Sequence, residues 1–349
     1  MSNLRGVLIG AGYFSQFHAD AWGRLPGVDL VAVCDADPAR AQALAERYGI
    51  ARTYADAAQM LEAERPDLVD IATPPATHHA LVEMAAARGM AVICQKPLAP
   101  TIEEARALIA MVEASGIRFM AHDNFRFQPW HREIRRQIDA GAIGRVQNIR
   151  CRTRMGDGWG EDAYLDRQPY FRTMPQLLIH ETGIHFLDIF RFLNGEITRC
   201  FARIDRLNPQ IMGEDQALVL CEFANGALGV WDANRYHPAG CANPRYTFGE
   251  FWIEGDRGSL HLDMDGRLRL FRLGDDMGEP VDYAAVREGF AGDSVLATFE
   301  HFIGALRGDV AQELTGADYL LSLELQEAAY LSSAGGGWVE VGRGFNGRR

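Results

Sequence analysis

A single lysine follows an apolar stretch, where a charged side chain needs a reason. In VICQKPLAPT, residues 92–101, the apolar letters VIC are typical of the end of a buried strand, and Gln95, Lys96 and a proline follow at once. A strand that ends here would hold the ammonium group of Lys96 rigidly, so that it could bind the oxygen of a reacting hydroxyl and favour its alkoxide. The alternative is a lysine that extends from a strand end into solvent.

A histidine and an acid share a predicted helix in IHETGIHFLDIFRFLNG, residues 179–195. Glu181 and His185 are one turn apart on one face of that helix. An acid beside an imidazole fixes its tautomer and raises its basicity, which suits a general base acting on an alcohol. An ion pair on a helix surface is the alternative. Zinc is disfavoured, because His180 and His185 are five residues apart and the zinc-binding helix needs four, so we expect no metal.

A glycine-rich turn, GAGYFS, follows the first apolar run of the chain. Gly10 would permit the tight turn and Gly12 would let the backbone approach a pyrophosphate. Ser15 stands where a third glycine is usual, and its hydroxyl could bind phosphate. We expect the whole turn, including Tyr13 and Phe14, to contact a dinucleotide.

An acid at the end of the next predicted strand indicates which dinucleotide it is. Asp35 lies 20 positions after Ser15, where a carboxylate can hold both hydroxyls of an adenosine ribose. It would repel a 2'-phosphate, and Ala36 supplies no arginine to bind one. The predicted cofactor is therefore NAD rather than NADP, and the alternative is a solvated surface aspartate.

The first part of the chain alternates apolar strands with helical stretches, which is typical of βαβ units. We predict an α/β fold in which residues 1–122 form a Rossmann domain with a doubly wound parallel sheet. Ligands of such sheets bind at the carboxyl ends of the strands. Gly10, Asp35, Thr73 with Pro74, and Lys96 all follow predicted strands, so we expect them around one crevice.

The rest of the chain has a different pattern. After a helix predicted in FQPWHREIRRQIDAGAIG, residues 127–144, alternating segments dominate, and EFANGALG and IEGDRGSL have the turn chemistry of hairpins. Two more helices are expected near residues 294–306 and 317–333. Residues 123–349 are therefore predicted to form an α+β domain with a large open antiparallel sheet that binds substrate and forms oligomers.

Composition limits the possible partners and the compartment. With 349 residues, 48% of them hydrophobic, the chain is long enough for two domains. A net charge of -12 disfavours nucleic acid and anionic membranes, and the sequence shows neither a spanning segment nor a signal peptide, so we expect a cytoplasmic protein. The six widely spaced cysteines are expected to be reduced thiols.

The alternation RCRTRM at residues 150–155 gives one face of a predicted strand three arginines. Such a face can simply be solvated. We expect instead that the broad sheet pairs with that of another subunit in a homodimer or homotetramer.

Several motifs together resemble a known family. GAGYFSQFHADAW, VCDADPARA, DIATPPATHHALVEMAAARGMAVICQKPLAPT and ETGIHFLDIFRFLNG, in this order, are similar to the glucose-fructose oxidoreductase and inositol dehydrogenase (Gfo/Idh/MocA) family over essentially the whole chain. The resemblance implies a Rossmann domain followed by an open sheet domain. It also implies that Lys96 and His185 act on a sugar or cyclitol hydroxyl beside NAD(P), and that Thr73, Pro74 and His78 touch the cofactor.

Two positions depart from the family pattern. Gln95 replaces the usual glutamate before the lysine, and Glu181 replaces the usual aspartate four residues before the histidine. The first removes an acid beside Lys96, and the second changes the depth of the pocket.

The expected activity is NAD-dependent oxidation of a sugar hydroxyl, at the anomeric carbon of an aldose, to give a lactone. A neutral polyol needs hydrogen-bond donors and an apolar face, and the candidates for these are Asn124, Arg126, Trp159 and Arg235. Each is equally well explained as a structural arginine or a core side chain. The alternatives are oxidation of a cyclitol ring hydroxyl, an NAD-sensing protein without turnover, and a methyltransferase, which gives no reason for Lys96.

Overall fold

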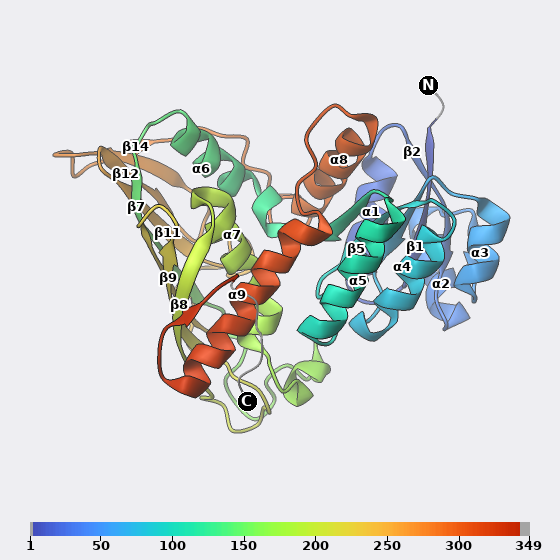
Figure 1. Ribbon diagram of the computed structural model, residues 1–349, viewed down its shortest axis with the longest axis horizontal. Coiled ribbons are helices and arrows are strands. Elements are labelled where there is room, and N and C mark those ends of the chain that lie inside the picture. Colours follow the sequence, from blue (N-terminus) through green and yellow to red (C-terminus); the bar gives the residue numbers. More distant parts are fainter. Residues whose placement is uncertain (1–2, 343–349) are drawn as a thin grey trace. The chain divides into compact units, whose positions relative to one another are not determined.

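The computed structural model describes residues 3–342, which fold into two compact units. The first unit comprises the chain up to Asn124 together with Asp293–Leu320. The second unit comprises Phe125–Gly292 and the chain from Leu321 onwards. Figure 1 labels many of their helices and strands.

The first unit contains a six-stranded parallel sheet in the order β3-β2-β1-β4-β5-β6. This is the strand order of a Rossmann domain, and the predicted fold class is confirmed. The strands are β1 (Leu4–Ile9), β2 (Val28–Cys34), β3 (Arg52–Tyr54), β4 (Leu68–Ile71), β5 (Ala91–Gln95) and β6 (Phe119–His122). The helices between them are α1 (Ser15–Arg24), α2 (Pro38–Tyr48), α3 (Ala57–Glu64), α4 (His78–Ala86) and α5 (Ile102–Ser115), with a short 3-10 turn η1 (Pro75–Thr77).

Local sequence sets the ends of these helices. The carboxylate of Asp37 accepts a hydrogen bond from the amide of Ala39 at the start of α2, and Gly49 ends that helix in a left-handed conformation. Thr101 and Glu104 form a reciprocal capping box at the start of α5. Capping interactions therefore fix both ends of α2 and the start of α5.

A late segment returns to the first unit. Helix α8 (Ser294–Arg307) packs on α1, where Phe299 stacks on Trp22 with ring centroids 3.9 Å apart. Asp293 pairs with Arg24 at 2.5 Å. The sequence had placed this segment in the second domain, because a helical pattern alone does not show which core its apolar side covers. The division between the units then falls within α9 (Gly316–Gly335), after Leu320.

The second unit contains, within the described residues, a nine-stranded sheet in the order β14-β13-β12-β11-β7-β10-β9-β8-β15. Its strands are β7 (Val146–Arg154), β8 (Ile197–Asp205), β9 (Gln216–Phe223), β10 (Leu228–Asn234), β11 (Glu250–Gly255), β12 (Gly258–Leu262), β13 (Leu268–Arg272), β14 (Glu279–Pro280) and β15 (Val339–Glu340). The hairpins β9-β10 and β11-β12 form as predicted. The sheet is mixed rather than purely antiparallel, because β7 and β10 pair in parallel.

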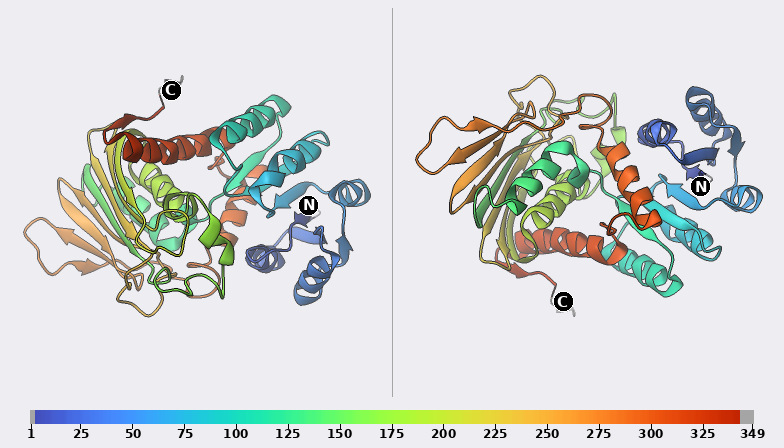
Figure 2. Two further views of the ribbon diagram at one scale, coloured as in Figure 1. Left: turned by 90° about the horizontal axis from the view of Figure 1, so that it is seen from below. Right: turned by 90° about the horizontal axis from the view of Figure 1, so that it is seen from above.

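Helices cover one face of this sheet, as Figure 2 shows. Helices α6 (Pro129–Asp139), α7 (Ile184–Asn194) and part of α9 share one apolar core with it, centred on Phe186, Trp231 and Phe251. On β7, Cys151 is buried and its neighbour Arg152 is exposed, as the alternating sequence predicts. The helix-covered face is therefore the apolar one.

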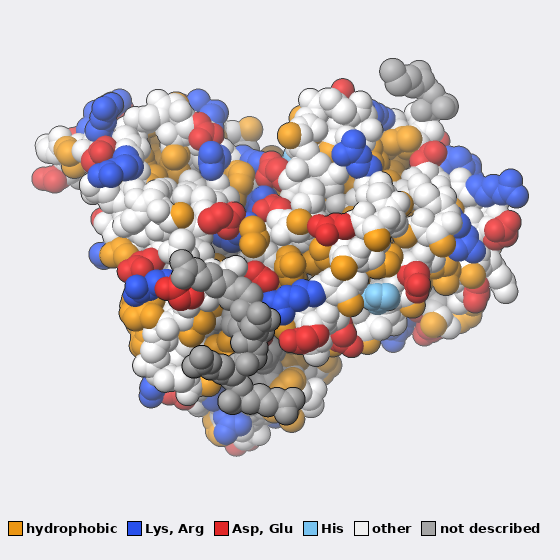
Figure 3. Space-filling view, in the orientation of Figure 1, with side chains coloured by type: hydrophobic (Ala, Val, Ile, Leu, Met, Phe, Trp, Pro, Cys, Tyr) orange, Lys and Arg blue, Asp and Glu red, His pale blue; other side chains and the backbone are white. Residues whose placement is uncertain are grey.

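Charged side chains of both signs are interspersed over the face of the molecule in Figure 3. Within residues 3–342, no helix combines the length and hydropathy needed to cross a membrane.

Candidate active site

The glycine turn after β1 has the geometry that a dinucleotide requires. Gly10 has φ of +107°, and a Cβ there would lie 2.7 Å from the carbonyl carbon of Ala72, so no other residue fits. Gly12 is exposed, and among the described residues nothing lies within 4 Å of the point where its Cβ would stand. Because the turn leads into α1, its backbone amides can receive a pyrophosphate at the helix N-terminus. The structure therefore fits NAD at this point.

Ser15 does not face the turn's outer surface. Its side chain is fully buried, and its hydroxyl has no hydrogen-bond partner among the described residues. It fills the position between helix and strand that a third glycine usually occupies. Tyr13, by contrast, is 48% exposed, and Phe14 is partly exposed at the start of α1.

Asp35 follows β2 and holds the glycine turn. One carboxylate oxygen accepts a hydrogen bond from the amide of Ala11 at 2.7 Å, and the other accepts one from the amide of Asp37 at 2.9 Å. The side chain remains partly exposed beside the turn. It therefore supports the phosphate-binding backbone and presents a negative charge next to it.

The loops after β4 and β5 are tied together by a buried histidine. His78 is fully buried, with Nε2 2.8 Å from the carbonyl oxygen of Thr73 and Nδ1 3.2 Å from that of Leu98. Burial lowers the pKa of His78, although these carbonyl oxygens partly offset the effect. Its ring cannot reach a ligand, so its part in a cofactor site is to position Thr73 and the adjacent Pro74.

Lys96 follows β5, at the same sheet edge as the glycine turn, Asp35 and Thr73. The amide oxygen of Gln95 accepts a hydrogen bond from the backbone amide of Lys96 at 2.8 Å. The Lys96 side chain is half-buried and is followed by a cis peptide to Pro97. The predicted strand therefore delivers its lysine to the ligand-binding edge of the first unit.

In the second unit, the predicted catalytic helix does not begin as a regular α-helix. Leu178–Gly183 form a π-helical turn, closed by a hydrogen bond from the amide of Ile184 to the carbonyl oxygen of Ile179, and α7 follows. A Cβ on Gly183 would lie 2.7 Å from ring atoms of Trp231, so this glycine lets the turn lie against the tryptophan. Such turns occur frequently at functional sites, and this one carries Glu181.

His185 lies on the first turn of α7 and is 5% exposed. Its ring stacks on Phe125, with centroids 3.9 Å apart and an interplanar angle of 8°. The carbonyl oxygen of Phe125 in turn accepts a hydrogen bond from Nδ1 of His131, at 2.9 Å. Burial lowers the pKa of His131 to about 3, so this support is a neutral imidazole.

A buried arginine connects the π-helical turn to β10. Arg235 donates to the hydroxyl of Thr182 at 3.0 Å and makes two hydrogen bonds to Asp157, at 3.2 and 2.6 Å. Burial alone would lower the pKa of Arg235, but interactions with Asp157, Tyr164 and Glu181 together outweigh it, and the pKa is raised. Arg235 is therefore always charged and holds the residue next to Glu181.

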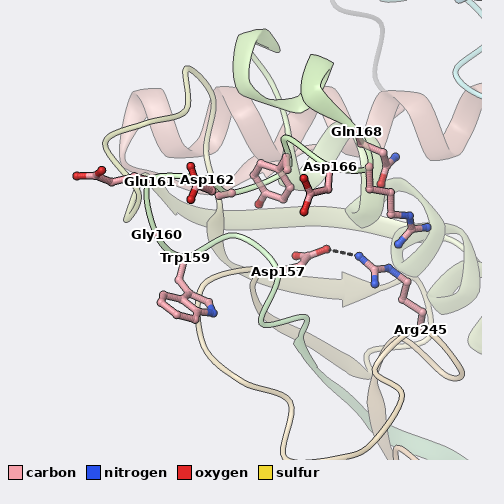
Figure 4. A pocket seen from close by; sticks show the side chains of 11 residues that line it. Asp157, Trp159, Gly160, Glu161, Asp162, Asp166, Gln168 and Arg245 are labelled. Carbon is pink, nitrogen blue, oxygen red and sulfur yellow. Dashed lines mark hydrogen bonds and ion pairs between the residues drawn. The ribbon is translucent and has the colours of Figure 1, made fainter.

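Beside this frame the second unit has a cavity of about 460 Å³. Figure 4 shows Asp157 and Arg245 pointing toward one another, joined at 2.7 Å, while Glu161 points away from the pair. Trp159 lines the cavity and is 64% exposed. Burial raises the pKa of Tyr164, another lining residue, to about 12, so its hydroxyl stays protonated.

The four predicted substrate residues have different surroundings. Trp159 offers an exposed apolar face, whereas the other three are at most 5% exposed. Asn124 donates to the hydroxyl of Ser294 at 2.6 Å within the first unit, and Arg126 binds Asp188 with two hydrogen bonds of 2.8 and 2.6 Å in the second.

Sequence reasoning missed the side chains that support the candidate residues. Phe125, Thr182 and Asp157 belong to this group, and nothing in their local sequence identifies their partners. One signal was present: Asp70 puts a carboxylate inside the apolar strand β4, and a buried charge needs a partner.

Comparison with protein families agrees with this geometry. Residues 4–122 match the model of the oxidoreductase family with an NAD-binding Rossmann fold, named GFO_IDH_MocA. Residues 131–261 match the C-terminal domain model of the same family.

Curated relatives match over nearly the whole chain. A D-apiose dehydrogenase of Paraburkholderia graminis is 37% identical, over 98% of this chain and 90% of its own length. A D-apiose dehydrogenase of Rhizobium rhizogenes is 35% identical, over 98% and 99%. An inositol 2-dehydrogenase of Rhizobium meliloti is 30% identical, over 95% and 97%.

Solved structures are similar as well. An oxidoreductase from Agrobacterium radiobacter, in complex with NAD+, L-tartaric acid and magnesium, has a TM-score of 0.89 and 34% identity, with 98% of this chain and 99% of that chain covered. A levoglucosan dehydrogenase in complex with NADH and levoglucosan has a TM-score of 0.86 over 97% and 99% of the chains; at 24% identity it supports the fold alone.

Proposed function

Since this chain belongs to the Gfo/Idh/MocA family of NAD-binding oxidoreductases, we propose that it oxidises the anomeric hydroxyl of a small aldose such as D-apiose to the lactone. The observation that supports this choice of substrate is the similarity to two D-apiose dehydrogenases over 98% of the chain. The family resemblance and the NAD cofactor predicted from the sequence are confirmed.

The proposed cofactor site is the carboxyl edge of the first unit's sheet. The glycine turn of residues 10–15 receives the pyrophosphate, with Tyr13 and Phe14 at its outer side. Asp35 binds the ribose hydroxyls. The nicotinamide end is contacted by Thr73, Pro74, Gln95 and Lys96. His78 positions Thr73 and Pro74 through its hydrogen bond to the Thr73 carbonyl oxygen.

In the proposed reaction, the anomeric carbon loses its hydrogen as hydride and its hydroxyl loses a proton, which leaves the carbonyl of the lactone. NAD supplies the hydride acceptor when it is bound. His185 accepts the proton, with Glu181 on the preceding turn, and Lys96 binds the same oxygen and stabilises its developing negative charge.

One property of the sequence supports a catalytic role for Lys96. It is the only lysine in the 349 residues, and every other permanently cationic side chain is an arginine. Arginine stays charged and donates through a planar fork, whereas an ammonium is a compact point charge. A chain that otherwise uses arginine throughout retains lysine at the one strand end where a single oxygen must be bound.

On the substrate side, we propose that Trp159 stacks on the apolar face of the sugar. Arg235 and Arg126 support the site without contacting the sugar directly, because each is buried and paired with a carboxylate. Asn124 contributes through its contact with Ser294.

A cyclitol is the second candidate substrate, because one relative that matches 95% of this chain is an inositol 2-dehydrogenase. The experiment is absorbance of the reduced nicotinamide with purified protein, NAD, and a panel of D-apiose, common aldoses, myo-inositol and scyllo-inositol. D-Apiose should give the highest kcat/KM and a lactone as product, and His185→Ala serves as the inactive control. A higher kcat/KM for either inositol would replace the aldose by a cyclitol, and no turnover with any member would leave the sensing protein as the better reading.

We also propose that the open face of the second unit's sheet pairs with a second copy of this chain. Leu218 and Leu228 are 40% and 48% exposed on adjacent strands of this sheet. Trp252 stacks on His261, which adds apolar area to the uncovered face. Light scattering should show a dimer or tetramer that Leu218→Glu dissociates and Val310→Glu, at an exposed apolar residue of the first unit, does not. A monomer at every working concentration would exclude this assembly.

We place the protein in the cytoplasm. All six cysteines, which lie within the described residues, are free thiols, and five of them are buried, as expected for a reducing compartment. Cell fractionation with an antibody to the chain tests this, and recovery from an oxidising compartment would contradict it.

A further inference from the structure

Four side chains form a buried polar cluster next to the backbone of Lys96, and three of them have no role in the reaction proposed above. They are His18 on α1, Asp70 on β4, Gln95 on β5 and His122 on β6, and we call them the Gln95 cluster. His18, Asp70 and His122 are fully buried, and Gln95 is partly buried. All belong to the first unit.

The orientation of the Gln95 amide is fixed by its own neighbour. The backbone N–H of Lys96 can only donate, and it lies 2.8 Å from one terminal atom of Gln95, so that atom is the oxygen. The other terminal atom is therefore the amide nitrogen. It lies 3.1 Å from Nε2 of His18 and 3.4 Å from Nδ1 of His122.

Both imidazoles must therefore accept hydrogen bonds from Gln95. Nε2 of His18 then carries no proton, and its Nδ1–H donates to Asp70 at 2.8 Å. The indole N–H of Trp22 donates to the same carboxylate oxygen at 2.7 Å, which holds Asp70 in place. The arrangement requires a neutral His18 with its proton on Nδ1.

The two imidazoles pack against each other and against aromatic rings. Their rings lie 4.3 Å apart between centroids, so two positive charges there would repel. The other side chains against His18 are apolar rings, Phe14 and Phe299. Asp70 is the one carboxylate in the Gln95 cluster, and the titratable groups that face His18 within the described contacts are Asp70 and His122.

We propose that Gln95 is a positioning residue for Lys96, and that its neutral amide, rather than the usual glutamate, is matched to two neutral imidazoles behind it. The amide nitrogen is anchored by His18 and His122, and the amide oxygen holds the Lys96 backbone. A carboxylate at position 95 would keep the bond to Lys96 but would face two acceptor nitrogens. The imidazoles would then have to bind protons before the contact became favourable. This inference rests on the proposed part of Lys96 in the reaction.

The first test needs no substrate and no substitution. Nitrogen NMR of histidine side chains in the unmodified protein reports which ring nitrogen is protonated, with His18→Asn used to assign the signal. We expect His18 to carry its proton on Nδ1 and none on Nε2 under the conditions of the turnover assay. A proton on Nε2 there would overturn the proposal, whether or not any variant folds.

The second test uses Gln95→Glu, which changes the polarity of the cluster at nearly constant shape. Gln59→Glu is the matched control, because Gln59 is exposed on α3 of the same unit. Because Lys96 is the only lysine, lysine labelled with 15N at Nζ gives one side-chain signal. In Gln95→Glu that signal should shift as the pH passes through the imidazole range, whereas in the control it should not.

Turnover gives the third readout. We expect kcat of Gln95→Glu to fall about tenfold at pH 8 and to recover relative to the unmodified protein as the pH is lowered toward 6, with NAD affinity changed by less than about threefold. A Lys96 signal and a kcat that follow the unmodified protein at every pH would overturn the positioning of Lys96 while leaving the dehydrogenase intact. Absence of sugar oxidation in the unmodified protein would instead contradict the proposed function, and the two NMR measurements would still decide on the Gln95 cluster.

Discussion

The two units hold their candidate catalytic side chains by different means. In the first unit, Lys96 follows a strand, and its backbone N–H donates a hydrogen bond to the side-chain oxygen of Gln95. In the second, His185 lies on a helix, and its ring is fixed by stacking on Phe125. Hydrogen bonds set direction, whereas stacking sets the plane of a ring. The proposed oxygen-binding group and the proposed proton acceptor are thus supported in different ways.

The largest effect should come from removing either side chain. We expect Lys96→Ala and His185→Ala each to lower kcat by about a hundredfold or more, the usual range for a lost electrostatic or acid-base group, with NAD binding retained. Steady-state kinetics with NAD titrated separately for each variant measures both quantities. If Lys96→Ala lost turnover only because it no longer bound NAD, the lysine would be a cofactor-binding residue and not a catalytic one. The contrast between the two units would then no longer concern two catalytic side chains.

The next effect concerns the cofactor edge of the first unit. Asp35→Ser with Ala36→Arg should remove the charge that repels a 2'-phosphate and add one that binds it, so the preference for NAD over NADP should fall at least tenfold. Because Asp35 also accepts hydrogen bonds from two backbone amides, some thermal stability should be lost as well. Ala36→Arg alone, which keeps the carboxylate, is the control. Equal use of both cofactors by the unmodified protein would contradict the assignment.

A smaller effect should follow from loosening the ring of His185. Phe125→Leu removes the stacked ring, and we expect kcat to fall about tenfold while the KM for NAD stays unchanged. Phe223→Leu, in the same apolar core but on β9, controls for the loss of buried area. An equal loss of turnover in both variants would mean that general destabilisation, not the orientation of His185, explains the result.

The last effect is on stability rather than turnover and depends on pH. The pKa of His131 is about 3 when folded and near 6.5 when unfolded, so the unfolded chain binds the extra proton as the pH falls below 6.5. Stability from this residue is complete above pH 6.5 and should decrease by about 2 kcal/mol by pH 5. Urea unfolding of the protein and of His131→Asn at a series of pH values measures it.

In His131→Asn, the pH dependence between 6.5 and 5 should be shallower, because an amide does not titrate there. His79→Asn, at an exposed histidine on α4, should keep the original slope. Parallel curves for His131→Asn and the unmodified protein would contradict a buried neutral imidazole behind Phe125.

Local patterns in the sequence predicted one side of this comparison better than the other. Local sequence identifies the glycine turn, Asp35 and Lys96, because the conformation at a strand end depends on adjacent residues. Phe125 and His185 are 60 positions apart in the chain, and nothing near either one indicates that their rings meet. The π-helical turn was also missed, since a 3.6-residue period fits the apolar side chains on both sides of it.

Buried charge was the one long-range signal that the sequence did contain. Asp70 interrupts an apolar strand and His18 faces inward from α1, and the structure pairs them. The sequence could show that each needed a partner but not which residue supplied it, because their separation of 52 positions is spanned by two other strands.

The return of α8 to the first unit has a consequence for how the chain is made. The sheet of this unit is complete once β6 ends at His122, but Phe299, which stacks on Trp22, is synthesised 177 residues later. At about 5–20 residues per second, ribosomes take roughly 9–35 s to add that length. During this interval one side of α1 lacks its cover, and a fragment cut after β6 would lack it permanently. Expression of the cofactor unit by itself therefore calls for a fusion that brings Asp293–Leu320 back to α1.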